Sequence, residues 1–155
     1  TYVAERTTGK IIVSKRYGPQ RVLATIPVDA SGDGGLIDFA FSPTYGQDGL
    51  IFALITTGSD NRVVRVAAGD VPKPILTGIP KGAGGNMGSM YFQSATELIV
   101  ATGDAGSRAA ASDPSSLPAR RSSMGCAAAG SSLPSICMSG TAIGRLPGGR
   151  SRRRA

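Results

Sequence analysis

The first 104 residues of the chain alternate between short apolar runs and turn residues, and this pattern restricts the fold more than any other feature. Runs of about four to eight residues rich in isoleucine, valine and aromatic residues, spaced about 8–12 residues apart, are typical of all-β sandwiches, barrels and propellers. No segment has a sustained helical period. We therefore expect an all-β fold with strands at residues 2–4, 10–14, 21–26, 36–41, 50–56, 62–66, 74–77, 90–92 and 97–102.

One of these runs, Leu50–Ile55, is apolar at every position and does not alternate with polar residues. An alternating strand buries one face, whereas a continuously apolar strand is typical of a sheet covered on both faces. This run therefore predicts a strand with further structure packed on each side, as in stacked propeller blades.

A weak internal repeat supports the same interpretation. Residues 35–39 match residues 88–92 at an offset of 53, and residues 50–53 match residues 98–101 at an offset of 48. Each unit consists of a glycine, an apolar strand, a turn and a second apolar strand. A period of roughly 40–50 residues with four strands per unit is typical of a propeller blade. Similar β-hairpins outside a propeller would give the same pattern.

The positive charge lies in one segment of the chain. The formal net charge is +7 and the isoelectric point is near 10.0. Residues 1–117 hold ten basic and ten acidic residues, whereas residues 118–155 hold seven arginines and no acidic residue. The second segment also lacks aromatic residues and has few large aliphatic ones, so it cannot bury enough apolar area to offset the entropy of folding. We therefore expect a folded segment, 1–117, and a disordered, low-complexity basic tail, 118–155.

Three origins are compatible with this tail. It could be a natural basic arm that binds an anionic partner, a solvated linker, or the product of a frameshift in GC-rich DNA. The abrupt loss of aspartate, glutamate, lysine and aromatic residues favours the frameshift. Both cysteines, Cys126 and Cys137, lie in the tail. Such a pair without any histidine indicates neither a zinc site nor a thiol catalyst.

The sequence contains no histidine, which excludes several kinds of chemistry. Ser-His-Asp and Cys-His nucleophiles, His-ligated zinc and an imidazole general base all require this residue. Asp29, Asp33 and Asp38 surround a glycine-rich loop, but their spacing fits no calcium-loop pattern. We therefore predict no metal site in this chain.

Three segments, Val3–Ile11, Gly34–Pro43 and Ala101–Gly106, resemble the soluble PQQ-dependent glucose/sorbosone dehydrogenase family. The similarity covers about residues 2–117. Within the family, the sequence most resembles an LppZ-type lipoprotein branch. The resemblance implies a six-bladed β-propeller that carries the quinone PQQ on its axis, is activated by calcium and takes a hydride from the sugar C1. We therefore expect a partial β-propeller of about two four-stranded blades from a six-bladed parent.

The resemblance also assigns family positions to individual residues. Gly85 stands where the family has its catalytic histidine, and Asp104, 19 residues later, matches the aspartate that orients this histidine. Asp33 takes the place of a glutamine that contacts the cofactor, and Asn86 is a second candidate contact in the loop that holds Gly85. Asp104 has an alternative interpretation, because Gly-Asp-Ala-Gly is a common turn in which the aspartate bonds its own backbone.

These positions favour a fragment of a sugar-dehydrogenase-like propeller that is not catalytic and has a binding or structural role. Two alternatives remain open: a piece of an active PQQ-dependent aldose or sorbosone dehydrogenase, and a basic-tailed protein that binds nucleic acid or anionic surfaces. We expect no cofactor in this chain, although the family uses PQQ and calcium. The expected partner is a small sugar-like ligand of the full-length parent, with no specific nucleic acid. The resemblance implies an extracytoplasmic or cell-envelope lipoprotein, held to the membrane only through a lipid anchor that this chain lacks.

Overall fold

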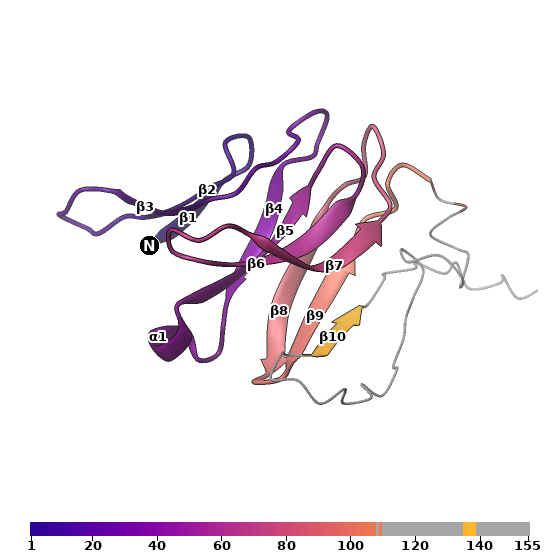
Figure 1. Ribbon diagram of the computed structural model, residues 1–155. Coiled ribbons are helices and arrows are strands. Elements are labelled where there is room, and N and C mark those ends of the chain that lie inside the picture. Colours follow the sequence, from indigo (N-terminus) through magenta and orange to yellow (C-terminus); the bar gives the residue numbers. More distant parts are fainter. Residues whose placement is uncertain (108, 110–134, 139–155) are drawn as a thin grey trace, which may run out of the picture.

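The structure is a computed structural model that describes residues 1–107, 109 and 135–138 of the chain. Within these residues, three β-sheets lie face to face along the chain (Figure 1). The first sheet contains β1 (Tyr2–Glu5), β2 (Lys10–Val13) and β3 (Arg21–Thr25); the second contains β4 (Leu36–Phe41), β5 (Leu50–Thr56), β6 (Asn61–Ala67) and β7 (Lys73–Ile79); the third contains β8 (Gly88–Ser94), β9 (Glu97–Thr102) and β10 (Ser135–Met138). A short helix, α1 (Tyr45–Asp48), connects β4 to β5.

The expected all-β partial propeller is confirmed, and each strand predicted from the apolar runs is present. The second sheet is a complete antiparallel blade in the order β4-β5-β6-β7. The sequence repeat corresponds to the first two strands of neighbouring sheets, β4 and β5 in one and β8 and β9 in the next. Among the described residues, one four-stranded sheet lies between two three-stranded sheets.

The connections alternate between two ends of the sheets. The turns and loops at residues 6–9, 26–35, 57–60, 80–87 and 103–107 lie at one end, which we call the loop end. The opposite end holds α1, and we call it the helix end. The turn between β1 and β2 lies at the loop end, as does the turn between β5 and β6. Strands β1, β2 and β3 of the first sheet therefore correspond to β5, β6 and β7 of the second. Among the described residues the first sheet has no counterpart of β4.

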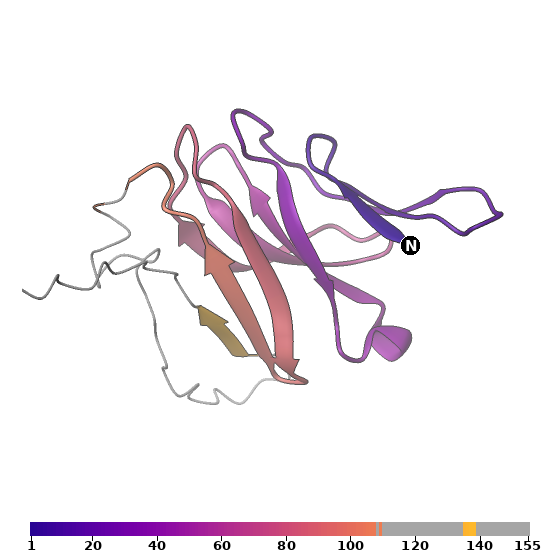
Figure 2. The same cartoon turned by 180° about the vertical axis from the view of Figure 1, so that it is seen from behind.

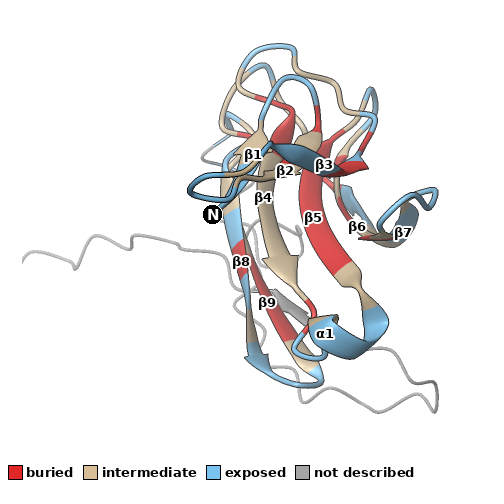
Figure 3. Ribbon diagram, turned by 90° about the vertical axis from the view of Figure 1, so that its left-hand side faces the viewer, coloured by how far each residue is buried: buried red, intermediate tan, exposed pale blue. Residues whose placement is uncertain are grey.

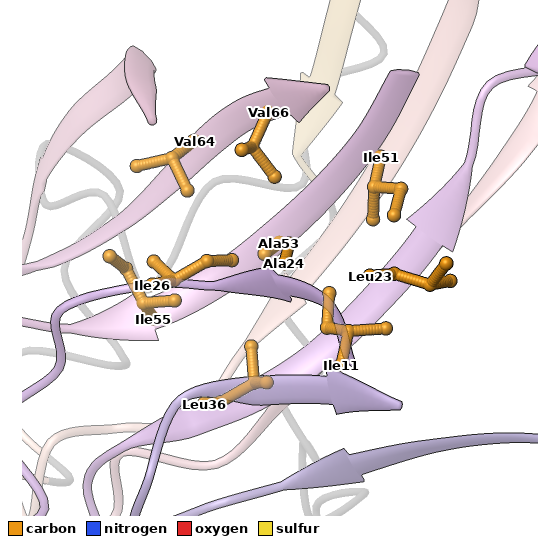
Figure 4. Close-up of a cluster of buried hydrophobic side chains, with 10 residues drawn as sticks. All are labelled: Ile11, Leu23, Ala24, Ile26, Leu36, Ile51, Ala53, Ile55, Val64 and Val66. Carbon is orange, nitrogen blue, oxygen red and sulfur yellow. The ribbon is translucent and has the colours of Figure 1, made fainter. Parts of the chain in front are cut away.

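The core consists of two apolar clusters, one on each face of the second sheet. Ile51, Ala53 and Ile55 of β5 point toward the first sheet, whereas Phe52 and Leu54 point toward the third. This confirms that the continuously apolar run is buried on both sides, and Figure 3 shows β5 buried along most of its length. The cluster between the first and second sheets contains Ile11, Leu23, Ala24, Ile26, Leu36, Ile51, Ala53, Ile55, Val64 and Val66 (Figure 4).

The third sheet packs against the other face of the second, as the view from behind shows (Figure 2). Its β8 is also fixed to β4 by a polar contact, in which the Met90 N–H donates to Asp38 Oδ2 at 2.8 Å. The aromatic rings of Phe52 and Phe92 meet edge to face with centroids 5.1 Å apart. The apolar members of this second cluster are Phe52, Leu54, Val63, Ile79, Met90, Leu98 and Val100.

Strand β10 was not expected, because it lies in the segment predicted to be a disordered tail. It pairs in parallel with β9, with Ser135 opposite Glu97 and Met138 opposite Val100. Without β10, the edge of β9 that faces away from β8 would present unpaired backbone groups, and an extended segment can bond to such an edge. Ile136, Cys137 and Met138 supply a short apolar run for this pairing. The remainder of the tail, with Cys126, lies outside the described residues, so its origin and the boundary at residue 117 stay predictions.

No helix in the described part of the chain is long and apolar enough to cross a membrane.

Candidate functional site

The residues that the family resemblance selects come together at the loop end. Asp33 lies in the loop before β4, Gly85 and Asn86 lie in the loop before β8, and Asp104 follows β9. Asp33 and Gly85 are 52 positions apart in the sequence, yet the Gly85 N–H donates to Asp33 Oδ2 at 2.6 Å. The stacking of the second and third sheets therefore joins two loops that the sequence separates by a whole blade.

The Asp33 carboxylate binds the loop that contains Gly85. Its Oδ2 accepts from the backbone N–H of Gly85, and from that of Asn86 at 3.2 Å. Its Oδ1 accepts from the Asn86 side-chain Nδ2 at 2.6 Å. A carboxylate that accepts several N–H donors of one loop fixes the conformation of that loop. We call these contacts of Asp33 with Gly85 and Asn86 the loop latch.

Asn86 connects the latch to the core. The residue is 2% exposed. Its Nδ2 also donates to the Gly82 carbonyl at 2.8 Å, and its Oδ1 accepts from the Gly82 N–H at 3.0 Å and from Asn61 Nδ2 at 3.1 Å. Asn61 also donates to the Pro80 carbonyl at 2.8 Å, and its own Oδ1 accepts from the Thr56 hydroxyl at 2.7 Å. Buried polar groups are stable when bonded in this way, so the loop before β8 has a defined shape.

Gly85 has no room for a side chain in this loop. Its φ is +72°, a left-handed conformation that glycine adopts without steric cost. A β-carbon at this position would lie 2.5 Å from Asp104 Oδ1, 2.5 Å from the Gly106 nitrogen and 3.1 Å from the Ala105 nitrogen. The Gly85 carbonyl accepts from the Ala105 N–H at 3.0 Å. The backbone of Gly85 is therefore packed directly against the segment that contains Asp104.

Asp104 lies beside Gly85. Its Oδ1 accepts from the Gly106 N–H at 2.9 Å, two residues further along its own turn. Its backbone carbonyl accepts from the Ser107 N–H at 2.8 Å. The short separation from Gly85 brings the two family positions together, although it leaves no space between them for an imidazole.

A second polar contact at the loop end was not predicted from the sequence. Lys81 Nζ donates to the Asp29 carboxylate, and also to the Thr57 carbonyl at 2.9 Å. These bonds connect the loops before β4 and β8 to the turn after β5. The hydrogen bond from Lys81 is the main cause that lowers the pKa of the Asp29 carboxyl, and a bond from Ser31 adds to it. The only sequence signal was a lysine beside a glycine-rich loop, which names no partner.

The pKa of Asp33 is lowered by its role in the latch. The largest cause is the hydrogen bond from the Asn86 side chain; desolvation raises the pKa, and the N–H groups of Gly85 and Asn86 lower it again. The net shift is downward, so Asp33 is a carboxylate at neutral pH. An efficient general base has a pKa near the working pH, and Asp33 does not meet this condition.

The latch predicts a loss of stability in acid. Because the pKa of Asp33 is lower in the folded than in the unfolded chain, its contribution is complete above about pH 4 and is lost as the pH falls through the folded pKa. We expect Asp33→Asn to lower the free energy of unfolding more at pH 7 than at pH 3, as measured by urea denaturation at both values. Asp70→Asn, at an exposed carboxylate, is the matched control. An equal effect of Asp33→Asn at both pH values would contradict the latch.

Comparison with known proteins gives the family. The model of the family described as "Glucose / Sorbosone dehydrogenase" matches residues 1–120. The PQQ-bound aldose sugar dehydrogenase of Streptomyces coelicolor is similar in structure, with 31% identity and a TM-score of 0.63, over 75% of this chain and 38% of that one. A glucose dehydrogenase-type oxidoreductase of Thermus thermophilus has 30% identity and a TM-score of 0.65, over the same shares.

The chain thus spans 38% of the length of each of these two proteins. A search of curated proteins finds no match. The family model covers most of the chain, and each of the two similar structures matches 75% of it. From these findings we conclude that the chain belongs to the glucose/sorbosone dehydrogenase family of PQQ-dependent sugar dehydrogenases.

Proposed function

We propose that this chain is part of a sugar-dehydrogenase-type propeller that no longer oxidises sugars and instead has a binding or structural role. The observation that carries the proposal is the packing of Gly85, the family's histidine position, against Asp104 and Gly106. It rests on the family resemblance for the role of position 85 and on the geometry for the lack of space there.

Proton removal in this reaction type requires a base within hydrogen-bond reach of the sugar hydroxyl. Gly85 has no side chain, and the chain contains no histidine at any other position. Asp104 Oδ1 is bonded to its own turn. Asp33 is a carboxylate of lowered pKa that accepts three N–H donors of the neighbouring loop. None of these residues fits the role of a base for sugar oxidation.

The residues at the cofactor positions do not fit PQQ either. PQQ is an anionic quinone, and Asp33 would place a second negative charge beside it. The side chain of Asn86 is buried, and both of its polar atoms bond within the loop and to Asn61. Among the described residues, no group of three histidine, cysteine or acidic side chains could hold a metal ion. We therefore assign no PQQ or calcium ligand among the residues that the structure describes.

The family resemblance supports two further parts of the proposal. The partner of the full-length parent is a small sugar-like ligand, since related propellers act on sugars. The location is the cell envelope, where a lipid anchor holds the protein, since the sequence resembles an LppZ-type lipoprotein branch of the family. Both parts follow from the resemblance alone, and mass spectrometry of the envelope-associated protein would test the anchor.

An activity assay tests the non-catalytic role directly. The chain is incubated with PQQ, calcium, an aldose and an artificial electron acceptor, with the Streptomyces coelicolor dehydrogenase in a parallel reaction. We expect reduction of the acceptor by the Streptomyces enzyme and none above the protein-free rate by this chain, because a base at position 85 is absent. Turnover by this chain that saturates with aldose would support the alternative, a piece of an active dehydrogenase.

A further inference from the structure

One cavity with no assigned role lies at the helix end, far from the loop latch. It has a volume of about 410 Å³ and opens between the first sheet and α1. Ligand pockets are typically about 300–1,000 Å³ in size, so this cavity can hold a single sugar unit. Its lining includes Tyr2, Val13, Lys15, Arg21, Leu23 and Tyr45.

The register of the first sheet builds one wall of this cavity. Tyr2 pairs with Val13, and Val13 pairs with Arg21, so these three side chains form a row on one face across β1, β2 and β3. Residues two positions apart on a strand share a face, and Ile11 and Leu23 on this face are buried in the core. The face is therefore apolar where it packs on the second sheet. At the helix end of this face, the row of Tyr2, Val13 and Arg21 lines the cavity.

Two tyrosines flank the cavity and share an aromatic support. The Tyr2 and Phe41 ring centroids are 4.6 Å apart, and the Phe41 and Tyr45 centroids are 4.5 Å apart, both in edge-to-face geometry. Phe41 thus fixes a tyrosine of the first sheet and a tyrosine of α1. Tyr2 remains 46% exposed. A tyrosine offers an apolar ring face and a polar hydroxyl together, and a sugar ring presents C–H groups and hydroxyls in the same way.

The cavity is positively charged. Lys15 and Arg21 line it together with no acidic side chain. The ion pairs among the described residues are Arg62–Asp60 and Lys81–Asp29, so neither cation of the cavity belongs to one. The nearby carboxylate of α1, Asp48, accepts from Ser42, Thr44 and the Leu50 N–H. A hollow that adjoins the cavity also includes Arg16.

We propose that this cavity binds a monosaccharide that carries a phosphate or carboxylate group. Lys15 and Arg21 bind the anionic group, and arginine suits it because its planar guanidinium bonds two oxygens at once. The sugar ring lies against Tyr2 and Tyr45. The cavity is at the opposite end of the sheets from Gly85 and Asp33, so this proposal does not depend on the loss of catalysis at the loop end.

Calorimetric titration of the full chain at low ionic strength tests the proposal. The probes are glucose 6-phosphate, glucuronate, glucose, inorganic phosphate and phenyl phosphate. We expect one of the two anionic sugars to bind at least tenfold more tightly than glucose, inorganic phosphate and phenyl phosphate. The two sugars distinguish phosphate from carboxylate as the anionic group. No binding of either sugar would overturn the proposal, as would equally tight binding of inorganic phosphate or phenyl phosphate.

Substitutions locate the binding. Lys15→Gln and Arg21→Gln are each expected to weaken binding of the anionic sugar at least fivefold, whereas Lys73→Gln, at an exposed lysine of β7, leaves it unchanged. Tyr2→Leu should weaken binding of the sugar more than binding of inorganic phosphate. Circular dichroism of each variant confirms that it is folded. Lys15→Gln and Lys73→Gln form the matched pair, because both lysines are exposed. Equal effects of Lys15→Gln and Lys73→Gln would overturn the assignment to this cavity.

Discussion

Replacing Gly85 with histidine is expected to destabilise the protein and to create no sugar dehydrogenase activity. The φ of +72° at Gly85 costs roughly 1–2 kcal/mol for any residue that has a β-carbon. The new β-carbon would also lie 2.5 Å from both Asp104 Oδ1 and the Gly106 nitrogen, so the segment after β9 would have to move. Denaturation in urea measures the loss of stability, and the assay with PQQ, calcium and an aldose measures any activity.

Met87→His is the matched control for this experiment. Met87 lies two residues further along the same loop and is 70% exposed. A histidine there should change the free energy of unfolding by no more than about 0.5 kcal/mol, as for most surface substitutions. If Gly85→His were as stable as Met87→His and oxidised aldoses, the proposed loss of catalysis would be a single reversible substitution in an otherwise intact site.

The largest effect on stability is expected for Phe52→Ala. Phe52 is 2% exposed and lies in the cluster between the second and third sheets, with its ring against Phe92. Replacement of a buried phenylalanine by alanine removes apolar contacts and leaves a cavity, which costs about 3–5 kcal/mol. We therefore expect a lower midpoint of urea denaturation, and at the upper end of this range a large unfolded fraction in buffer alone.

Tyr17→Ala is the control for Phe52→Ala. Tyr17 lies in the turn between β2 and β3 and is 90% exposed. The Arg16 guanidinium carbon lies over its ring, 5.3 Å from the ring centroid. Replacement of Tyr17 should cost about 0.5 kcal/mol or less. Similar effects of the two substitutions would mean that the third sheet does not pack on β5 in solution.

The strands were predictable because their signals are local. An apolar run, its length and the glycine, proline or asparagine that ends it are all read within a few residues. The same holds for β5, since residues that point to opposite faces of a strand are neighbours in the sequence. Strand β10 was missed because its pairing depends on a free edge of β9 and not on a strong signal in its own composition.

The candidate site was predictable only in part. The family resemblance selected Asp33, Gly85, Asn86 and Asp104, and the structure brings all four to the loop end. The resemblance gave no sign of the roles of Asn61 and Lys81. Their polar contacts join loops about 24–52 residues apart. Contacts of this kind depend on how one sheet stacks on the next, and no window of the sequence contains both partners.

The sequence by itself determined strands β1 to β9, which strand is buried on both faces, where the net charge lies and that no histidine is available. Local backbone preference and composition are enough for each of these. Only the tertiary structure decided that Gly85 has a left-handed backbone in contact with Asp104, that the Asp33 carboxylate is occupied by a loop, and that Tyr2, Arg21 and Tyr45 surround one cavity. These features arise where loops and strands of different sheets meet, and burial of the two apolar clusters sets how the sheets stack.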